Sequence, residues 1–282
     1  MDVIHTVAEL RKRLNGEPTI ALVPTMGNLH DGHISLVDIA HEHATCVVTS
    51  IFVNRLQFAP DGDFARYPRT LAEDCVKLEA AGCHVVFAPD EKEMYPAPQE
   101  ILVTPPKAAD QLCGTFRPGH FQGVVTVVSK LFNIVAPHTA VFGKKDYQQL
   151  FIIRALVKQL NFGIEIVGGE TIRDVDGLAM SSRNGYLTRE ERAHAALLFH
   201  SLRKIKKAID DGSHRYQRHE EVATADLSMA GWRVEYVAVR NRSELAPPHP
   251  KDTELVVLGA AWMGKTRLID NAEIDISHAA PD

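Results

Sequence analysis

Apolar segments of strand length alternate with segments of helical spacing over the first two thirds of the chain. Five runs have the composition of buried strands: residues 19–23, 46–54, 84–88, 139–142 and 164–167. Between them, apolar residues recur at three- and four-residue intervals, as on one face of a helix, near residues 34–40, 71–78, 124–135 and 150–157. This alternation predicts an α/β domain with a doubly wound, Rossmann-like parallel sheet, which we place at residues 1–175.

Residue types that begin helices mark several of these boundaries. The strings 70–73 and 188–191 both have the Thr-x-x-Glu spacing of a capping box. Asp146 and Gln149 have the spacing of an N-cap residue and its partner in the first turn. We expect a helix to begin at each of these points. Arg117 and His120 precede the helix expected from residue 124, and one interpretation places both in a solvated loop.

The pattern changes in the last third of the chain. A helix with Leu198, Leu202 and Ile205 on one face is followed by apolar or alternating strands, at residues 233–239, 254–258 and 267–271. This order predicts a smaller α+β domain, residues 176–282, which we expect to act as a lid domain.

The string Gly259–Thr266 fits the Walker A phosphate-binding pattern letter by letter. A P-loop must lead from a strand into a helix within a βαβ unit, whereas residues 267–271 have the pattern of another strand. Too few residues follow to complete a nucleotide-binding core. We therefore interpret the small residues as tight packing between two strands.

Composition narrows the class of protein. The 282 residues are 45% hydrophobic and 24% charged, which is ordinary for a globular protein. A formal net charge of -5 provides no basic field for nucleic acid. No apolar run approaches the roughly 18 residues of a membrane span, and residues 1–14 are charged and amphipathic rather than secretory. We expect a cytoplasmic protein with neither a membrane nor a nucleic-acid partner.

The four cysteines form no C-x-x-C pair. This spacing favours reduced, buried thiols over disulfides or a zinc knuckle. We expect no catalytic thiol among them.

The first glycine-containing turn holds the main candidate chemistry. It follows the strand at 19–23 and contains His30 and His33, with Gly27 and Gly32 beside them. On the first turn of a helix, side chains three residues apart share a face. The unpaired N–H groups and the helix dipole at that end favour an anion such as phosphate. Two alternatives are histidines that only cap and pack, and a zinc site, although no third ligand stands at zinc-site spacing.

Three further segments carry polar groups suited to an anionic substrate. Asn54 and Gln57 follow the strand at 46–54, and their amides can donate to a carboxylate or accept from a hydroxyl. Gly143 and Lys145 lie at another strand-to-helix turn, where an ammonium supplies a point charge for phosphate. Residues 181–183, Ser-Ser-Arg, combine hydroxyl donors with a guanidinium fork. Each string taken alone also fits an ordinary solvated loop.

Four separated strings, in one order, resemble a known family. His30-x-x-His33 resembles the HxGH signature of the nucleotidyltransferase and class I aminoacyl-tRNA synthetase superfamily. The longer string PTMGNLHDGH at 24–33 resembles that of the pantothenate synthetases, or pantoate–β-alanine ligases. FVNRLQF at 52–58, GKKDYQQ at 143–149 and SSRN at 181–184 resemble three further motifs of that family, and YPRT at 67–70 another.

The resemblance implies an ATP-dependent ligase that joins pantoate to β-alanine through a pantoyl-adenylate and releases AMP and pyrophosphate. It implies four catalytic residues: His33, His30, Lys145 and Arg183. The residues implied to bind ATP are Thr25, Met26, Gly27, Asn28, Leu29, His30, Asp31, Gly32, His33, Gly143, Lys144, Lys145, Asp146, Ile172, Met180, Ser181, Ser182 and Arg183. The residues implied to bind pantoate or β-alanine are Gln57, Gln149, Pro24, Met26, Asn54 and Tyr67.

The resemblance also implies a homodimer, and ATP would bring Mg²⁺ held mainly by phosphate oxygens and water rather than by a protein metal site. Arg55 replaces the family's proline, and Lys144 its glutamate. We expect Arg55 to loosen its loop or bring charge near the site, and Lys144 to make the local field more positive. Two alternative functions are an adenylyltransferase that leaves AMP on its product and a nucleotide-binding protein without activity.

Overall fold

The structure is a computed structural model, and it describes residues 1–59 and 64–276. The chain divides into two compact units, Met1–Thr171 and Ile172–Asp282. This division lies just before the boundary placed at 175/176 from the sequence. The physical reason is a short pairing: the Met180 N–H donates to the Ile172 carbonyl (2.9 Å), and Arg173 forms an isolated β-bridge with Ala179.

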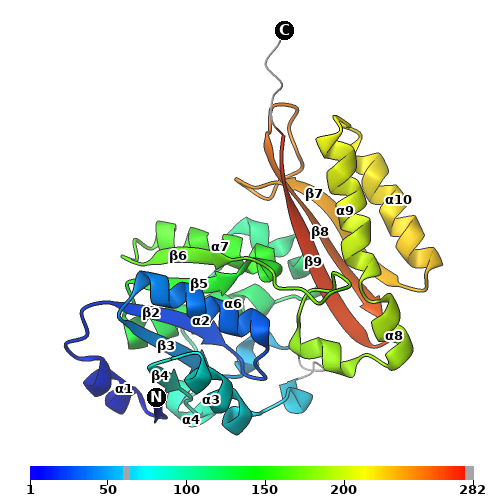
Figure 1. Cartoon of the computed structure of the whole chain (residues 1–282). Helices are drawn as coiled ribbons and strands as arrows, with labels where there is room; N and C mark the ends of the chain where they lie inside the picture. Colours follow the sequence, from blue (N-terminus) through cyan, green and yellow to red (C-terminus); the bar gives the residue numbers. More distant parts are fainter. Residues whose placement is uncertain (60–63, 277–282) are drawn as a thin grey trace. The chain divides into compact units, whose positions relative to one another are not determined.

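The first unit contains one parallel sheet, as the sequence predicted (Figure 1). Its strands run in the order β1-β4-β3-β2-β5-β6. The bounds are β1 Asp2–Ile4, β2 Ile20–Thr25, β3 Cys46–Ile51, β4 Val85–Phe87, β5 Thr139–Gly143 and β6 Glu165–Gly169. Strand β1 is not apparent in the sequence, because three residues are too few to show a period. It pairs with β4 at the edge of the sheet, Asp2 opposite Val85.

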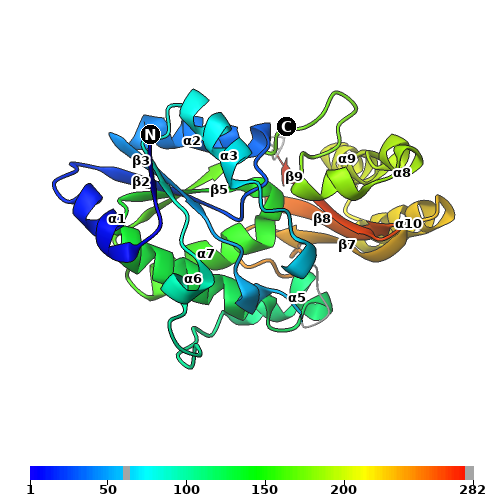
Figure 2. The same ribbon diagram turned by 90° about the horizontal axis from the view of Figure 1, so that it is seen from below.

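Helices cover both faces of this sheet. Helices α2 and α3 lie on one face, and α1, α6 and α7 lie on the other (Figure 2). The longer helices are α1 Val7–Leu14, α2 Asp31–His43, α3 Leu71–Ala80, α6 His120–Val135 and α7 Tyr147–Gln159; shorter helical segments are η1 Arg55–Gln57, η2 Phe64–Arg66, α4 Glu91–Met94, η3 Lys107–Asp110, α5 Cys113–Phe116 and η4 Lys144–Asp146. Because the sheet is covered on both faces, β2 and β3 are almost wholly buried, which explains their continuous apolar runs.

Helix starts agree with the sequence only in part. The capping box of Thr188 and Glu191 is present. The one expected at Thr70 is wrong: Thr70 occupies the N-cap of α3, but its hydroxyl donates to the Asp74 carboxylate (3.1 Å) instead of capping the helix. Asp146 occupies the N-cap of α7 without a side-chain capping bond. Helix α6 begins at His120, earlier than the expected residue 124, after Gly119 in the left-handed region (φ 78°).

The second unit is the smaller α+β domain that the pattern predicted. It contains an antiparallel sheet in the order β7-β8-β9, with β7 Arg233–Asn241, β8 Glu254–Met263 and β9 Thr266–Asp275. Helices α9 Leu197–Asp210 and α10 Tyr216–Met229 pack against it, and η5 Ser182–Tyr186 and α8 Arg189–His194 precede them (Figure 1). Arg173 forms a bidentate ion pair with the buried Asp270 carboxylate (2.7 and 2.8 Å), which fixes the start of the unit to β9.

The Walker-like string forms a β-hairpin, which confirms the packing interpretation. Gly259 lies in β8, and Gly264 and Lys265 form the turn between Met263 and Thr266. A Cβ atom at Gly259 would lie 2.9 Å from the Leu198 Cδ1 atom of α9. Glycine is therefore needed there for close helix-to-sheet packing and not for phosphate.

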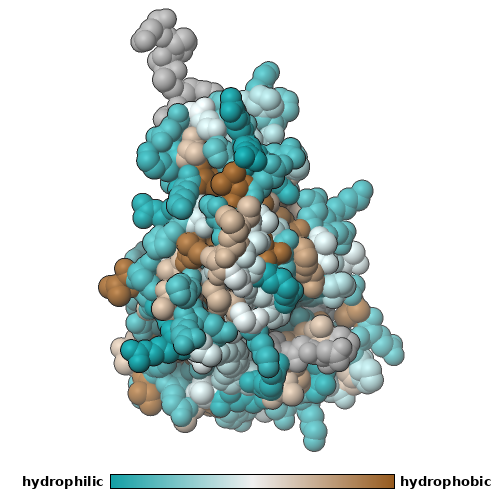
Figure 3. Space-filling model, turned by 90° about the vertical axis from the view of Figure 1, so that its right-hand side faces the viewer, coloured by the Kyte–Doolittle hydropathy of each residue, from teal (hydrophilic) through white to brown (hydrophobic). Residues whose placement is uncertain are grey.

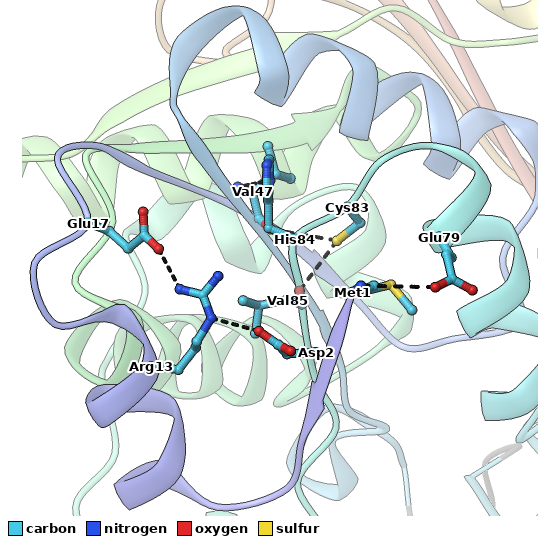
Figure 4. Close-up of polar contacts among 9 residues, drawn as sticks. All are labelled: Met1, Asp2, Arg13, Glu17, Val47, Glu79, Cys83, His84 and Val85. Atoms are coloured by element: carbon cyan, nitrogen blue, oxygen red, sulfur yellow. Dashed lines mark hydrogen bonds and ion pairs between the residues drawn. The ribbon is translucent and has the colours of Figure 1, made fainter.

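The amino-terminal edge of the parallel sheet carries polar contacts of a structural kind (Figure 4). Arg13 donates to Asp2 (2.7 Å) and pairs with Glu17, and His84 Nδ1 accepts from the Val47 N–H (3.0 Å). The four cysteines are present as thiols, and burial raises the pKa of Cys46 to about 11. Burial likewise raises the pKa of Cys83. These two thiols stay protonated near neutral pH, which agrees with the expected reduced, buried cysteines.

The outer surface is mostly polar where Figure 3 shows it. Hydrophilic residues predominate on that face, and hydrophobic residues occur in small groups among them. Over residues 1–59 and 64–276, no helix is both long and apolar enough to cross a membrane.

The hairpin interpretation predicts different results for two variants. We expect Gly259→Val to lower the free energy of unfolding by about 1–3 kcal/mol, because the added carbons overpack the contact with α9. Lys265→Ala removes an exposed side chain and should leave the free energy of unfolding nearly unchanged. The KM for ATP, the ligand that the family resemblance implies, should stay within about twofold of the parent value. Urea denaturation and ATP kinetics measure these effects. A large rise in the KM for ATP in Lys265→Ala would show that the string is a phosphate site after all.

Candidate active site

The strand order places two turns side by side at the carboxyl edge of the sheet. Strand β2 pairs with β3 on one side and with β5 on the other, through Ala21 opposite Thr139 and Leu22 opposite Ala140. The connections leaving β2 and β5 therefore run to opposite faces, and ligands of open parallel sheets bind at such a switch point. The turn after β2 carries the histidines, and the turn after β5 carries Lys145.

The two histidines share a face at the start of α2, as the sequence predicted. His30 occupies the N-cap and His33 the third helical position, and their ring centroids are 4.1 Å apart. The His30 N–H donates to His33 Nδ1 (3.3 Å). This bond assigns the proton of a neutral His33 ring to Nε2, which can then donate to a ligand oxygen.

Burial keeps both rings neutral near pH 7. It lowers the pKa of His30 to about 4, and the charges of Lys145 and Lys77 contribute to the shift. Burial lowers the pKa of His33 to about 3, with further contributions from His30, Lys145 and Lys77. Before any anion binds, the pair consists of neutral hydrogen-bonding groups beside lysine charges rather than two imidazolium cations.

The lysines after β5 differ in their surroundings. The ammonium of Lys145 influences both histidine rings, and it lies 4.0 Å from the Asp146 carboxylate. Lys144 forms an ion pair with Glu170. The Glu170 carboxylate partly balances the charge of Lys144, and the expected gain in positive field at this turn stays a prediction.

A second polar group forms where η1 follows β3. Asn54 is buried; its Nδ2 donates to Gln57 Oε1 (3.0 Å) and to the Gly123 carbonyl of α6 (3.1 Å). Its Oδ1 accepts from the Tyr95 hydroxyl (2.7 Å). Gln57 Nε2 in turn contacts Met26 Sδ (3.1 Å) after β2. The structure thus brings Met26, Asn54 and Gln57 together, and it uses the Asn54 amide to orient Gln57.

Arg55, which we expect to loosen its loop or bring charge near the site, has defined side-chain partners in the structure. Its guanidinium forms a bidentate pair with Glu91 (2.7 and 3.2 Å) and stacks over the Phe64 ring, 4.5 Å from the centroid. The charge that replaces the family's proline is therefore paired with the Glu91 carboxylate, and its effect on the loop stays a prediction.

The remaining candidates of the first unit occupy defined positions. Gln149 is half-buried in the first turn of α7, and Tyr67 is buried with its ring 6.0 Å from that of Phe58. Thr25 donates to the Ser50 carbonyl (2.8 Å). The side chain of Leu29 belongs to the core, and its backbone N–H and carbonyl bond Asp74 and Lys77, so the structure shows no group of Leu29 directed at a ligand.

Sequence reasoning missed several supporting residues. His120 is buried at the start of α6; its Nδ1 bonds the Gln57 carbonyl (2.8 Å) and its Nε2 the Arg117 guanidinium (3.0 Å). Gln148 is buried and bonds Ala108, Gln111 and Cys113. A solvated-loop interpretation does not fit these contacts. Partners so distant in the chain leave no local signal in the sequence.

The candidates at 172 and 180–183 lie together in the second unit. Ile172 and Met180 are joined by the backbone bond described above. The Ser181 hydroxyl accepts from the Arg183 N–H (3.2 Å) at the start of η5, and Asn184 Nδ2 donates to the Ala179 carbonyl (3.0 Å). These bonds give the Ser-Ser-Arg segment a defined backbone.

Among the described residues, no group of three or more His, Cys, Asp or Glu side chains has the arrangement of a metal site. The zinc alternative for His30 and His33 therefore has no third protein ligand in that part of the chain.

The open parallel sheet, with a histidine pair and a lysine at its switch point, defines the class: an α/β nucleotide-binding protein. Comparison with known proteins identifies the family. A family profile described as Pantoate-beta-alanine ligase matches residues 2–273, and the chain belongs to this family. The family resemblance found in the sequence is confirmed.

Full-length relatives agree with this assignment. The chain is 58% identical to the pantothenate synthetase of Nitrosospira multiformis, over 97% of this chain and 98% of that protein. Among solved structures, the pantothenate synthetase of Thermus thermophilus is 40% identical, with a TM-score of 0.91 over 96% of this chain and 99% of that one. The pantoate-beta-alanine ligase of Francisella tularensis, complexed with beta-gamma ATP and beta-alanine, is 32% identical, with a TM-score of 0.77 over 96% and 97%.

The buried histidines predict a pH dependence of stability. Their folded pKa values lie below the ordinary value near 6.5, so the unfolded chain takes up protons first as the pH falls. The contribution of neutral His33 is complete above about pH 6.5 and is lost progressively below it. Between pH 7 and 5 we expect His33→Asn to lose roughly 2 kcal/mol less unfolding free energy than the parent protein. Urea denaturation of the ligand-free proteins at both pH values measures this, and equal losses would contradict it.

Proposed function

We propose that this protein condenses pantoate with β-alanine, using ATP and releasing AMP and pyrophosphate. The single observation that carries this function is the juxtaposition of phosphate-suited groups and an oriented amide at the carboxyl edge of one sheet. The phosphate-suited groups are His30, His33 and Lys145, and the oriented amide is that of Gln57. Family membership supplies the substrate class, and the Francisella relative carries ATP and β-alanine in its crystal structure.

In the first half-reaction, a carboxylate oxygen of pantoate attacks the α-phosphorus of ATP. The bond from that phosphorus to the bridging oxygen breaks, and pyrophosphate leaves with its electron pair. The pantoyl-adenylate remains bound. Little covalent chemistry is required of the protein, so positioning and charge stabilisation provide most of the rate. His33 Nε2–H donates to the leaving phosphate oxygens, His30 assists it, and the Lys145 ammonium balances the charge that develops.

Pantoate lies against the amides. Gln57, held by Asn54, donates from Nε2 to the carboxylate or accepts a hydroxyl at Oε1, and Gln149 provides a second amide. Pro24, Met26 and Tyr67 line the same side.

In the second half-reaction, the β-alanine amine attacks the acyl carbon of the adenylate. The carbon–oxygen bond to AMP breaks, the amine loses a proton, and pantothenate and AMP leave. Ser182 and Arg183 act on the phosphates of ATP, with hydroxyl and guanidinium donors.

Magnesium enters with the nucleotide. Two carboxylates, those of Asp31 and Asp146, act on the charge of His30. Mg²⁺ needs more ligands than these two groups supply. A magnesium ion would therefore be held mainly by phosphate oxygens and water. The ion would neutralise phosphate charge when bound.

We also propose a homodimer in the cytoplasm. The dimer rests on the family resemblance, and the four thiols fit a reducing compartment. Sedimentation equilibrium tests the dimer: a mass near twice 31.2 kDa is expected, and a single-chain mass at micromolar concentration would contradict it.

Product analysis tests the reaction directly. Mg-ATP is incubated with pantoate, with β-alanine, and with both, and pyrophosphate and AMP are measured in each mixture. We expect free AMP only when both acids are present, since the amine is needed to break the acyl-phosphate bond. AMP retained on a product would indicate an adenylyltransferase. No turnover in any mixture would indicate a binding protein without activity.

A histidine variant tests the assignment of His33. We expect His33→Ala to lower kcat at least about 100-fold, because a donor to the transition-state phosphate is lost. His41→Ala on the same helix is the matched control, since that ring is exposed and contacts the Ala81 carbonyl instead. Near-normal turnover of His33→Ala would remove His33 from the mechanism.

A further inference from the structure

Asp74 is a buried carboxylate outside every motif that the sequence singled out. It lies on α3 and is only 1% exposed. One oxygen, Oδ1, accepts from the Leu29 N–H (2.7 Å). The other, Oδ2, accepts from the Asn28 N–H (2.8 Å) and the Thr70 hydroxyl (3.1 Å). A carboxylate withdrawn from water must be matched by such donors, and both backbone donors come from the turn that leads into His30.

The turn adopts a backbone that needs external support. Gly27 and Asn28 follow one another in the left-handed region, with φ of 81° and 52°. Glycine adopts this region readily, whereas Asn28 carries a modest steric cost that fixed partners offset. A Cβ at Gly27 would lie 3.1 Å from Asp74 Oδ2, so the carboxylate packs directly against the turn as well as bonding it.

Lys77 completes the contact one helical turn later. Its ammonium donates to the Leu29 carbonyl. Asp74 and Lys77 together bind both backbone polar groups of Leu29, whose side chain is anchored in the core. Helices α2 and α3 lie side by side on one face of the sheet (Figure 2). We call these two residues the α3 clamp.

The clamp acts at the residue immediately before the histidines. His30 follows Leu29 and forms the N-cap of α2, and His33 lies in its first turn. A displacement of the Asn28–Leu29 backbone would therefore shift both rings relative to the phosphates. Since Asp74 occupies the N–H groups of Asn28 and Leu29, the clamp also leaves phosphate recognition to groups further along the chain.

We propose that Asp74 and Lys77 are positioning residues for His30 and His33: they hold the Asn28–Leu29 backbone so that the histidine pair meets the transferring phosphate. This inference rests on the proposed ligase function. It assigns no direct contact with substrate to either residue. Misplacement of a catalytic group by a fraction of an ångström lowers the rate without preventing substrate binding.

The test compares Asp74→Asn with Thr70→Val. The asparagine keeps the volume and one acceptor but turns an NH2 group toward a backbone N–H donor. The valine removes only the third donor and leaves both backbone bonds. We expect Asp74→Asn to lower kcat for pyrophosphate release roughly 10- to 100-fold. The KM for pantoate should stay within about twofold, because Asn54, and not the Asn28–Leu29 backbone, orients Gln57. Thr70→Val should stay within about threefold of the parent kcat.

A second variant tests the proposal even if Asp74→Asn does not fold. Lys77→Met keeps the apolar stem and loses the donor to the Leu29 carbonyl, and it should show a smaller fall in kcat with the same unchanged KM for pantoate. Thermal denaturation of each variant confirms that the assays are made on folded protein. Should Asp74→Asn not fold, Lys77→Met decides the question. The proposal is overturned by a folded clamp variant with parent kcat, or by one in which kcat falls and the KM for pantoate rises together.

Histidine NMR separates this inference from the ligase function. If the parent protein releases no product, the function has failed, and ring spectra of ¹⁵N-histidine samples still test the clamp. Displaced rings in Asp74→Asn should titrate differently from those of the parent protein, whereas Thr70→Val should match it. Identical His30 and His33 titrations in all three proteins would overturn the clamp.

Discussion

The pairing of β2 with β5 is the contact on which the site depends. These strands come from distant parts of the chain and meet in the centre of a sheet covered on both faces, where every backbone N–H and C=O must find a partner. Burial of Ala21, Leu22, Ala140 and Val141 drives the association. Because the strands are parallel, their carboxyl ends meet at one edge, and the turns bearing His33 and Lys145 become neighbours as a consequence.

Electrostatics at that edge follow from the same packing. Burial of the histidines removes water that would stabilise their charged forms, and the nearby lysines disfavour protonation further. The site therefore presents oriented neutral donors together with fixed lysine charges. An arrangement of this kind is prepared for the charge of a polyphosphate before the ligand arrives, which is the property expected where positioning and charge stabilisation dominate the rate.

Local pattern was sufficient for much of the fold. The main strands of the parallel sheet, the helical segments between them and the packing of small residues at 259–266 between two strands were predicted correctly, because each has a pattern within a short window. The errors share a different cause. Strand β1 is too short to show a period, and Thr70 donates to Asp74 instead of capping its helix. In each case a partner brought close by the fold decided the outcome.

The sequence by itself determined the class of fold, the two-part organisation and the family, because motif strings in a given order and hydrophobic periods are local properties that survive without coordinates. It also identified the histidine pair, since a three-residue separation on a helix start fixes a shared face. Only the tertiary structure decided which groups support that pair. Asp74 and Lys77 on α3, and Asn54 and Tyr95 behind Gln57, act through bonds between residues far apart in the chain. Such bonds depend on distances that packing sets, and a linear pattern contains no information about them.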